Sequence, residues 1–288
     1  MTLLQFMEHI KTPETALRFF QRMRWRDGVA CQKCGVIDSS KRHNQTKLGF
    51  QKYYCKECRH IFSDTSGTFL HRKRITPQQL LITVFELADN KSITSVKLGK
   101  RLGLKQRKAW NILHIVRQHF HKLMRQMNLE GMRGVVESDE AYLGRGGNST
   151  MVQGIVQRGK TAMIIPIPDR TEETLKENIE KRVKKHSYIM TDTAAAYGSL
   201  ACHGYSHFTL NHSQKEFSRG NGIHANTIEG LWGNLKKVLY GIHHGVAKKN
   251  LFGYVSEYLL KYNTRDKSNF FTYLLSMLFR PTFLPLTC

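Results

Sequence analysis

Three acidic residues in the second half of the chain stand where they could share a metal site. Asp139 lies in a short β-like run that begins at Val135, and Asp192 ends a second such run, Tyr188–Asp192. Glu229 follows on an amphipathic helix. Separated carboxylates on strand, strand and helix are the oxygen ligands with which two divalent cations are held in phosphoryl transfer. The pattern therefore predicts metal-dependent phosphodiester chemistry on nucleic acid.

The helix that carries Glu229 also presents a cation. Lys236 lies seven residues after Glu229, thus on the same side two turns later, where it could hold a DNA phosphate. Lys237 follows it directly. A simpler role for Glu229 is an acid that complements the helix dipole near the helix start. That role explains Glu229 alone and leaves the two aspartates unexplained.

Four neighbouring residues have more than one interpretation. Glu137 shares a strand face with Asp139 and could also point into the site, whereas Glu140 should face the other way. His224 could assist catalysis or contact DNA, but lone histidines more often do neither. Trp232 is most simply a core residue.

The cysteines indicate a second kind of metal site. Of six cysteines, four form two C-x-x-C pairs with 20 residues between them: Cys31, Cys34, Cys55 and Cys58. This spacing is typical of a structural zinc site, which supplies folding energy to a segment with few apolar residues. Four thiolates leave no open position, so a catalytic zinc is not expected. Cys202 is interpreted as a buried apolar residue, and Cys288 as part of a frayed terminus.

The charge of the chain points to a polyanionic partner. Its 288 residues contain 45 Lys and Arg against 22 Asp and Glu, a formal net charge of +23. The basic residues are spread over every segment, which favours nucleic acid as the partner. The sequence has neither a run of about 18 uncharged apolar residues nor a signal peptide, so we expect no membrane association and a reducing compartment.

The segment between the cysteines and the acids has the pattern of three helices. The first starts at Thr76-Pro77, the second covers Ile93–Leu102 and turns at Gly103, and the third begins near Lys105. Two helices around a glycine turn suggest a helix-turn-helix, although an ordinary helical hairpin has the same pattern. In a helix-turn-helix the third helix would offer five residues to DNA: Lys105, Gln106, Arg107, Lys108 and Asn111.

The acidic residues lie in a segment that alternates strands and helices. We expect strands at 135–139, 152–156, 162–167, 188–192 and 208–210, with helices at 171–185 and 194–200, a polar loop at 214–225 and the Glu229 helix after it. This order predicts an α/β domain of the RNase H kind.

Three blocks of this segment resemble the DDE transposases of bacterial insertion sequences. The blocks are Asp139–Gly144, Thr191-Asp192 with Ala196-Tyr197, and His224–Lys237. The similarity is greatest to the group with an N-terminal zinc ribbon, the insertion-sequence 1595 type. It implies that Asp139, Asp192 and Glu229 are the metal-binding triad with Lys236 as companion. Some members of the group have asparagine in the third role, so Asn226, one turn before Glu229, is the reserve ligand.

The resemblance also implies an activity and its partners. It implies a transposase that binds the terminal inverted repeats of its element, cuts DNA with two Mg²⁺ or Mn²⁺ ions and joins the ends to target DNA. One structural Zn²⁺, a homodimer or larger homo-oligomer, and a place at the nucleoid in the bacterial cytoplasm belong to this expectation. The alternatives are a non-catalytic zinc-ribbon DNA-binding regulator and an RNase H-like nuclease that cuts without joining.

The chain is expected to contain five segments. They are an N-terminal helical segment at 1–28, a zinc ribbon at 29–75, a helix-turn-helix module at 76–130, an RNase H-like DDE catalytic domain at 131–266 and a C-terminal tail at 267–288.

Overall fold

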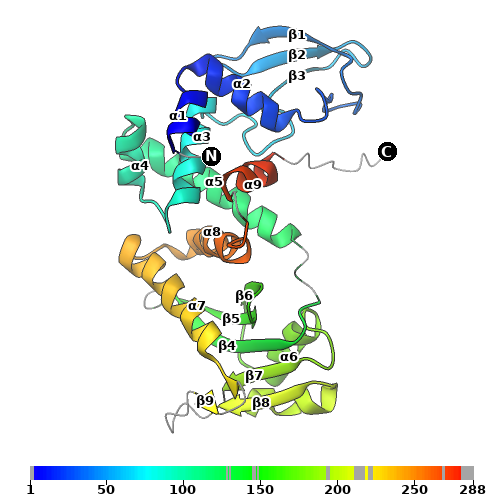
Figure 1. Ribbon diagram of the computed structural model, residues 1–288, viewed down its shortest axis with the longest axis vertical. Helices are drawn as coiled ribbons and strands as arrows, with labels where there is room; N and C mark the ends of the chain where they lie inside the picture. The colour runs from blue at the N-terminus through cyan, green and yellow to red at the C-terminus, as the bar shows by residue number, and fades with distance from the viewer. Residues whose placement is uncertain are drawn as a thin grey trace. The chain divides into compact units, whose positions relative to one another are not determined.

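The chain divides into two compact units, each considered by itself. A computed structural model describes residues 3–127, 129, 131–144, 147, 149–192, 195–210, 218–219, 223–267 and 270–279. The first unit comprises residues 1–119 with 267–288, and the second comprises residues 120–266. Figure 1 shows the elements of both.

A small antiparallel sheet and a helix pair form the start of the first unit. The sheet has the order β1 (Ser40–Gln45), β2 (Gln51–Cys55), β3 (Ile61–Ser63). Two helices precede it, α1 (Leu3–His9) and α2 (Pro13–Arg24). The N-terminal helical segment is thus two helices, because Thr12 accepts a hydrogen bond from the Thr15 backbone N–H and starts α2 as its N-cap.

The three helices predicted after the ribbon are present. They are α3 (Pro77–Asp89), α4 (Ser95–Leu102) and α5 (Gln106–Gln126), the last continuing into the second unit. Gly103 ends α4 at φ 62° in the left-handed region, where glycine carries no steric penalty. The turn after α4 therefore occurs at Gly103, as predicted from the sequence.

A late helix of the chain contributes to the core of the first unit. Helix α9 (Phe270–Leu278) contacts α2 and α3. The Phe271 ring packs against Phe6 at 4.8 Å and Phe85 at 5.3 Å between ring centroids. The C-terminal segment thus contributes aromatic side chains to a core whose other members come from the beginning of the chain.

The second unit is built on a five-stranded mixed sheet. Its order is β6-β5-β4-β7-β8, with antiparallel pairing among β4, β5 and β6 and parallel pairing of β4 with β7 and of β7 with β8. This is the strand order of the RNase H-like fold, and it confirms the predicted fold class. The strands are β4 (Val135–Leu143), β5 (Thr150–Gln157), β6 (Ala162–Pro166), β7 (Tyr188–Asp192) and β8 (Ser206–Leu210).

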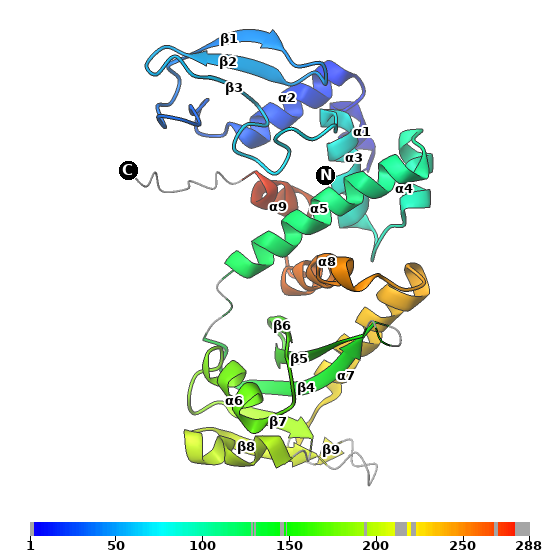
Figure 2. The same ribbon diagram turned by 180° about the vertical axis from the view of Figure 1, so that it is seen from behind.

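Helices cover both faces of this sheet (Figures 1 and 2). One face packs against α6 (Glu172–Glu180) and the 3₁₀ helix η2 (Ala195–His203) around Val136 and Ile189. The other face packs against α7 (Asn226–Lys236), which contacts β4 and β5.

The remaining elements of the second unit refine the predicted boundaries. Helix α6 ends at Glu180 rather than near 185, and part of the expected loop forms a two-residue ladder, β9 (Ser218–Arg219) with β10 (Ile223–His224). Helix α7 continues as the π-helix η4 (Lys237–Ile242), and η5 (Lys248–Asn250) leads into α8 (Leu251–Asn263).

None of the helices within the described ranges is both long and apolar enough to span a lipid bilayer.

Candidate active site

The two predicted aspartates lie at the same level on neighbouring parallel strands. In the pairing of β4 with β7, Glu137 stands opposite Met190. Asp139 and Asp192 are each two residues further along their strands. Because side chains alternate along a strand, both aspartates point to the face opposite the one that Val136 and Ile189 share with α6. That is the face on which α7 lies, and both side chains are half-buried there.

Helix α7 packs closely at this level because β5 has a glycine there. Gly154 is the β5 residue opposite Asp139. A Cβ atom at Gly154 would lie 2.6 Å from the Trp232 ring and 3.2 Å from Ile228, so a larger residue would displace the helix. Gly154 therefore allows α7 to approach the strand that carries Asp139.

Trp232 does more than fill the core. It is 5% exposed, as expected of a core residue. Its indole Nε1–H also donates a 2.9 Å hydrogen bond to Oδ2 of Asp139. This role was missed from the sequence. Buried indoles usually find an acceptor, but nothing in the residue spacing names Asp139 as that acceptor.

The other predicted site residues lie on exposed positions of α7. Glu229, Lys236 and Asn226 are all exposed, with Glu229 and Lys236 separated by seven residues and Asn226 one turn before Glu229. Lys237 is exposed at the start of η4. Across the described ranges, the carboxylates of Asp139, Asp192 and Glu229 do not all lie within 4.8 Å of one another, unlike the cysteine sulfurs below. The role of Glu229 or Asn226 as third ligand stays a prediction.

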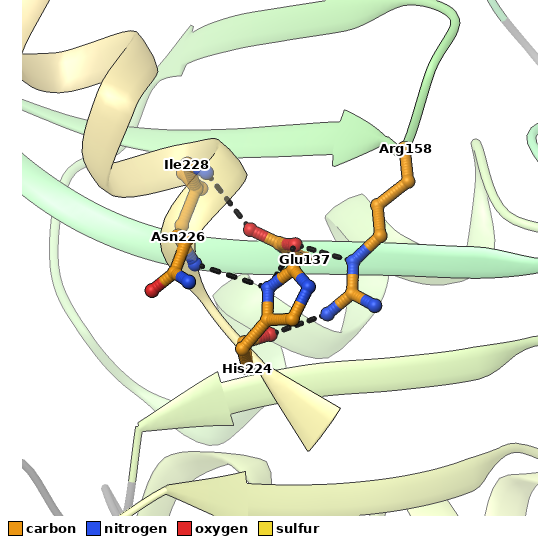
Figure 3. Close-up of polar contacts among 5 residues, drawn as sticks. All are labelled: Glu137, Arg158, His224, Asn226 and Ile228. Carbon is orange, nitrogen blue, oxygen red and sulfur yellow. Dashed lines mark hydrogen bonds and ion pairs between the residues drawn. The ribbon is translucent and has the colours of Figure 1, made fainter. Parts of the chain in front are cut away.

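Glu137 is not free to act as a metal ligand. It shares the strand face of Asp139, as expected, but its side chain is fully buried in a polar cluster (Figure 3). Its Oε1 accepts from Arg158 Nε at 2.6 Å, and its Oε2 accepts from the backbone N–H of Ile228 at 2.8 Å. His224 Nδ1 lies 3.6 Å from the same carboxylate.

Glu140 lies on the opposite face, as expected, yet the charges of the two aspartates affect its pKa. It contacts the hydroxyl of Tyr197. Burial raises the pKa of Glu140, and the negative charges of Asp139 and Asp192 raise it further. Carboxylates gathered at one end of the sheet fit hard divalent cations such as Mg²⁺, which take oxygen ligands.

The four paired cysteines form a compact sulfur cluster in the first unit. Their Sγ atoms all lie within 4.8 Å of one another, with 3.5 Å from Cys31 to Cys58 and 3.6 Å from Cys34 to Cys55. A tetrahedral site with Zn–S bonds of about 2.3 Å has sulfur–sulfur edges of about 3.8 Å. The residues therefore fit Zn²⁺. A hydrogen bond from the Cys58 backbone lowers the pKa of Cys55 to about 7, whereas burial raises the pKa of Cys58.

A buried aspartate ties this ribbon to α2. Asp64 is fully buried and accepts hydrogen bonds from Trp25 Nε1 at 2.8 Å, the Tyr53 hydroxyl at 3.0 Å and the Gln51 backbone at 2.8 Å. Gln21 of α2 donates to it at 3.1 Å. No sequence pattern indicates this network, whose members are separated by up to 43 residues.

The predicted DNA-facing residues of the helix-turn-helix are exposed. Ala109 and Ile112 turn inward on α5, and the exposed residues include all five that were predicted: Lys105, Gln106, Arg107, Lys108 and Asn111. Trp110, also exposed, stacks on His114 with 4.9 Å between ring centroids. Their contact with DNA stays a prediction.

One interpretation of an isolated residue was wrong. Cys202 is exposed rather than buried, because it lies near the end of η2 on the side away from the Tyr197 and Leu200 core. Cys288 lies outside the described residues.

Two family models match this chain, and each covers one of the two candidate metal sites. Residues 11–61, which include all four paired cysteines, match the transposase zinc-ribbon domain. Residues 131–263, which include Asp139, Asp192 and Glu229, match the ISXO2-like transposase domain. The two together define a class of protein, transposases in which a zinc ribbon precedes an RNase H-like domain. The chain carries a segment that matches the transposase zinc-ribbon domain and a segment that matches the ISXO2-like transposase domain.

Two curated relatives carry related descriptions. A protein in transposable element ISH50 of Halobacterium salinarum is 23% identical over 274 residues, covering 85% of this chain and 89% of that protein. A transposase-like protein of Haemophilus influenzae is 29% identical over 102 residues, covering 35% of this chain and 80% of that protein.

Solved structures with some similarity include an integrase core domain and a chain of a transpososome. The catalytic core domain of HTLV-2 integrase, in complex with magnesium, has a TM-score of 0.30 and 13% identity, covering 47% of this chain and 88% of that one. A chain of a pre-cleavage Mos1 transpososome has a TM-score of 0.24 and 12% identity, covering 96% of each chain. These scores are low, and the fold assignment rests on the strand order of the sheet.

Proposed function

We propose that this transposase binds the terminal inverted repeats of its insertion sequence, cuts DNA there and transfers the cut strand to target DNA. The observation that carries the proposal is the placement of Asp139 and Asp192 at one level of two parallel strands, on the face covered by α7. That helix carries Glu229 and Lys236.

The site residues have distinct tasks in this proposal. Asp139, Asp192 and Glu229 hold two Mg²⁺ or Mn²⁺ ions, with Asn226 as the alternative third ligand. Bound metal supplies an activated oxygen nucleophile and stabilises the leaving oxygen. Trp232 holds one oxygen of Asp139 by its indole N–H, which fixes the carboxylate orientation. Lys236 and Lys237 on the exposed side of the helix hold DNA phosphates.

The first unit would recognise the element ends. One Zn²⁺ on the four cysteines stabilises the ribbon, and the exposed start of α5 contacts bases in the major groove. Two ends must be held together for transposition, so the active form is a homodimer or a larger homo-oligomer. The five predicted segments, 1–28, 29–75, 76–130, 131–266 and 267–288, and a place at the bacterial nucleoid are part of the proposal.

Amide variants of the acidic residues test the chemistry. Asp139→Asn, Asp192→Asn and Glu229→Gln should each reduce strand cleavage and joining in Mg²⁺ or Mn²⁺ to near background while leaving binding to element ends intact. Each change removes a charged ligand and keeps the side-chain shape, so the loss is chemical. Gel assays on end-containing DNA measure cutting, joining and binding separately.

The same assays separate the alternatives. Silent Asn226→Ala with inactive Glu229→Gln assigns the third ligand to Glu229, and the reverse assigns it to Asn226. Normal cleavage by all four variants would refute the catalytic proposal. Cutting without joining by the wild type would indicate a nuclease, and end binding without cutting would indicate a regulator.

A further inference from the structure

The helix that carries Glu229 begins without a cap of its own. Four helices in the described part of the chain, α2, α3, α4 and α6, begin after a threonine in extended conformation whose hydroxyl accepts from the third helical N–H. The N-cap of α7 is Ala225, with ψ of 20°. A methyl side chain has no acceptor, so the first turn of α7 needs one from elsewhere.

Glu137 supplies that acceptor from a distant strand. Its Oε2 accepts from the backbone N–H of Ile228, the third residue of α7, at 2.8 Å. This is the N–H that the capping threonines satisfy in the other helices. A carboxylate is also favoured there by the positive end of the helix dipole. Glu137 therefore replaces a local cap by one from 91 positions earlier in the chain.

Arg158 holds this carboxylate in place and links it to His224 (Figure 3). Arg158, directly after β5, donates from Nε to Glu137 at 2.6 Å and from Nη2 to the His224 carbonyl at 2.6 Å. His224 Nδ1 lies 3.4 Å from the backbone N of Asn226, the first residue of α7. The cluster of Glu137, Arg158 and His224, here called the helix-start cluster, thus joins β4, β5 and β10 to the first turn of α7.

Two residues joined by this cluster are close in sequence to the proposed metal ligands. Ile228 directly precedes Glu229, and Glu137 stands two residues before Asp139 on the same strand face. We propose that Glu137 is a positioning residue that sets the location of Glu229 and Asn226 relative to Asp139 and thereby tunes divalent-metal affinity. This inference rests on the proposed metal site.

Two substitutions of Glu137 separate positioning from the burial of a charge. Glu137→Met removes both acceptor oxygens at similar side-chain volume, whereas Glu137→Gln removes the charge and keeps an oxygen that can accept from Ile228. Manganese is the probe. Its free electron paramagnetic resonance signal is titrated against the full-length, zinc-loaded protein on end-containing DNA, which measures binding without catalysis.

We expect a graded loss of affinity. Glu137→Met should weaken Mn²⁺ binding about tenfold or more, the range found when the partners of metal ligands are removed. Glu137→Gln should lose less. Zinc content and binding to element ends should stay unchanged, because both belong to other parts of the chain.

Glu257→Gln is the matched control. Glu257 is 3% exposed, lies in the same unit and pairs with Lys261 at 2.9 Å on α8. The Glu257→Gln variant should have a lower thermal stability, because a buried ion pair is lost. Its Mn²⁺ affinity should be unchanged. An equal loss of affinity in this control would show that any destabilisation of the unit weakens the site, and would overturn the inference.

Two further results decide the matter. Wild-type Mn²⁺ affinity in a folded Glu137→Met would overturn the inference. If that variant does not fold, a loss of about tenfold or more in Glu137→Gln would do so, because that variant keeps the acceptor for the Ile228 N–H. Metal-dependent cleavage by the wild type is measured separately. Its absence would contradict the proposed function, whereas cleavage together with wild-type affinity in the variants would reject only the role of Glu137.

Discussion

At the scale of single residues, the contact between Trp232 and Asp139 links the core to the chemistry. Trp232→Phe removes the indole N–H that bonds Oδ2 of Asp139, together with the outer part of the ring that packs against Gly154. A carboxylate that loses an orienting hydrogen bond holds metal less well, so we expect cleavage to fall by about tenfold. The melting temperature should also fall, because one lost hydrogen bond costs about 1 kcal/mol and the smaller ring leaves a cavity beside Gly154.

Tyr258→Phe serves as the control for this prediction. It removes a hydrogen bond from α8 to the same helix, donated by the Tyr258 hydroxyl to the Leu231 carbonyl at 3.2 Å, without touching Asp139. Parallel cleavage time courses and thermal melts should show a loss of activity for Trp232→Phe alone. Equal activity of the two variants would mean that the indole N–H has no part in orienting the carboxylate.

At the scale of elements, the zinc ribbon depends on its metal more than on its core. Its apolar cluster consists of Tyr53, Phe62 and two cysteines, with Trp25 and Val29 packed beside them. Such a core is too small to stabilise three short strands alone. The ribbon and the Asp64 network that joins it to α2 should therefore be lost together when zinc is removed.

Cys34→Ser tests this dependence. Elemental analysis should find about one zinc per wild-type chain and much less in the variant, with loss of the ordered ribbon by circular dichroism, because zinc binding is folding free energy in such sites. Cys202→Ser, at an exposed thiol outside the cluster, should retain the metal. Full zinc retention by Cys34→Ser would disprove the assignment.

At the scale of the whole molecule, the charge of +23 should govern the affinity for DNA. Each phosphate neutralised by Lys or Arg releases counterions, so binding to element ends should weaken about a hundredfold or more between 50 and 200 mM salt. Arg107→Ala and Lys108→Ala should each lower the slope of log affinity against log salt by about 1 if they contact phosphates. Fluorescence anisotropy at several salt concentrations measures the slope, and a flat dependence would contradict this use of the charge.

Local patterns in the sequence predicted the elements and their chemistry. The cysteine spacing indicated the sulfur cluster, Thr76-Pro77 and Gly103 marked helix boundaries, and alternating apolar residues located the strands of the second unit. These features are local because helix caps, turns and strand periodicity act between residues a few positions apart.

Only the tertiary structure decided which residues support the site. Glu137 and Ile228 are 91 positions apart, and Asp139 and Trp232 are 93 apart. Their hydrogen bonds depend on strand register and on the close packing of α7 against Gly154. Neither of these can be predicted from the periodicity of a short stretch of sequence. The sequence by itself determined which acids share a strand face. The packing of a helix from late in the chain on an earlier strand determined that Glu137 caps this helix while Asp139 is held by Trp232.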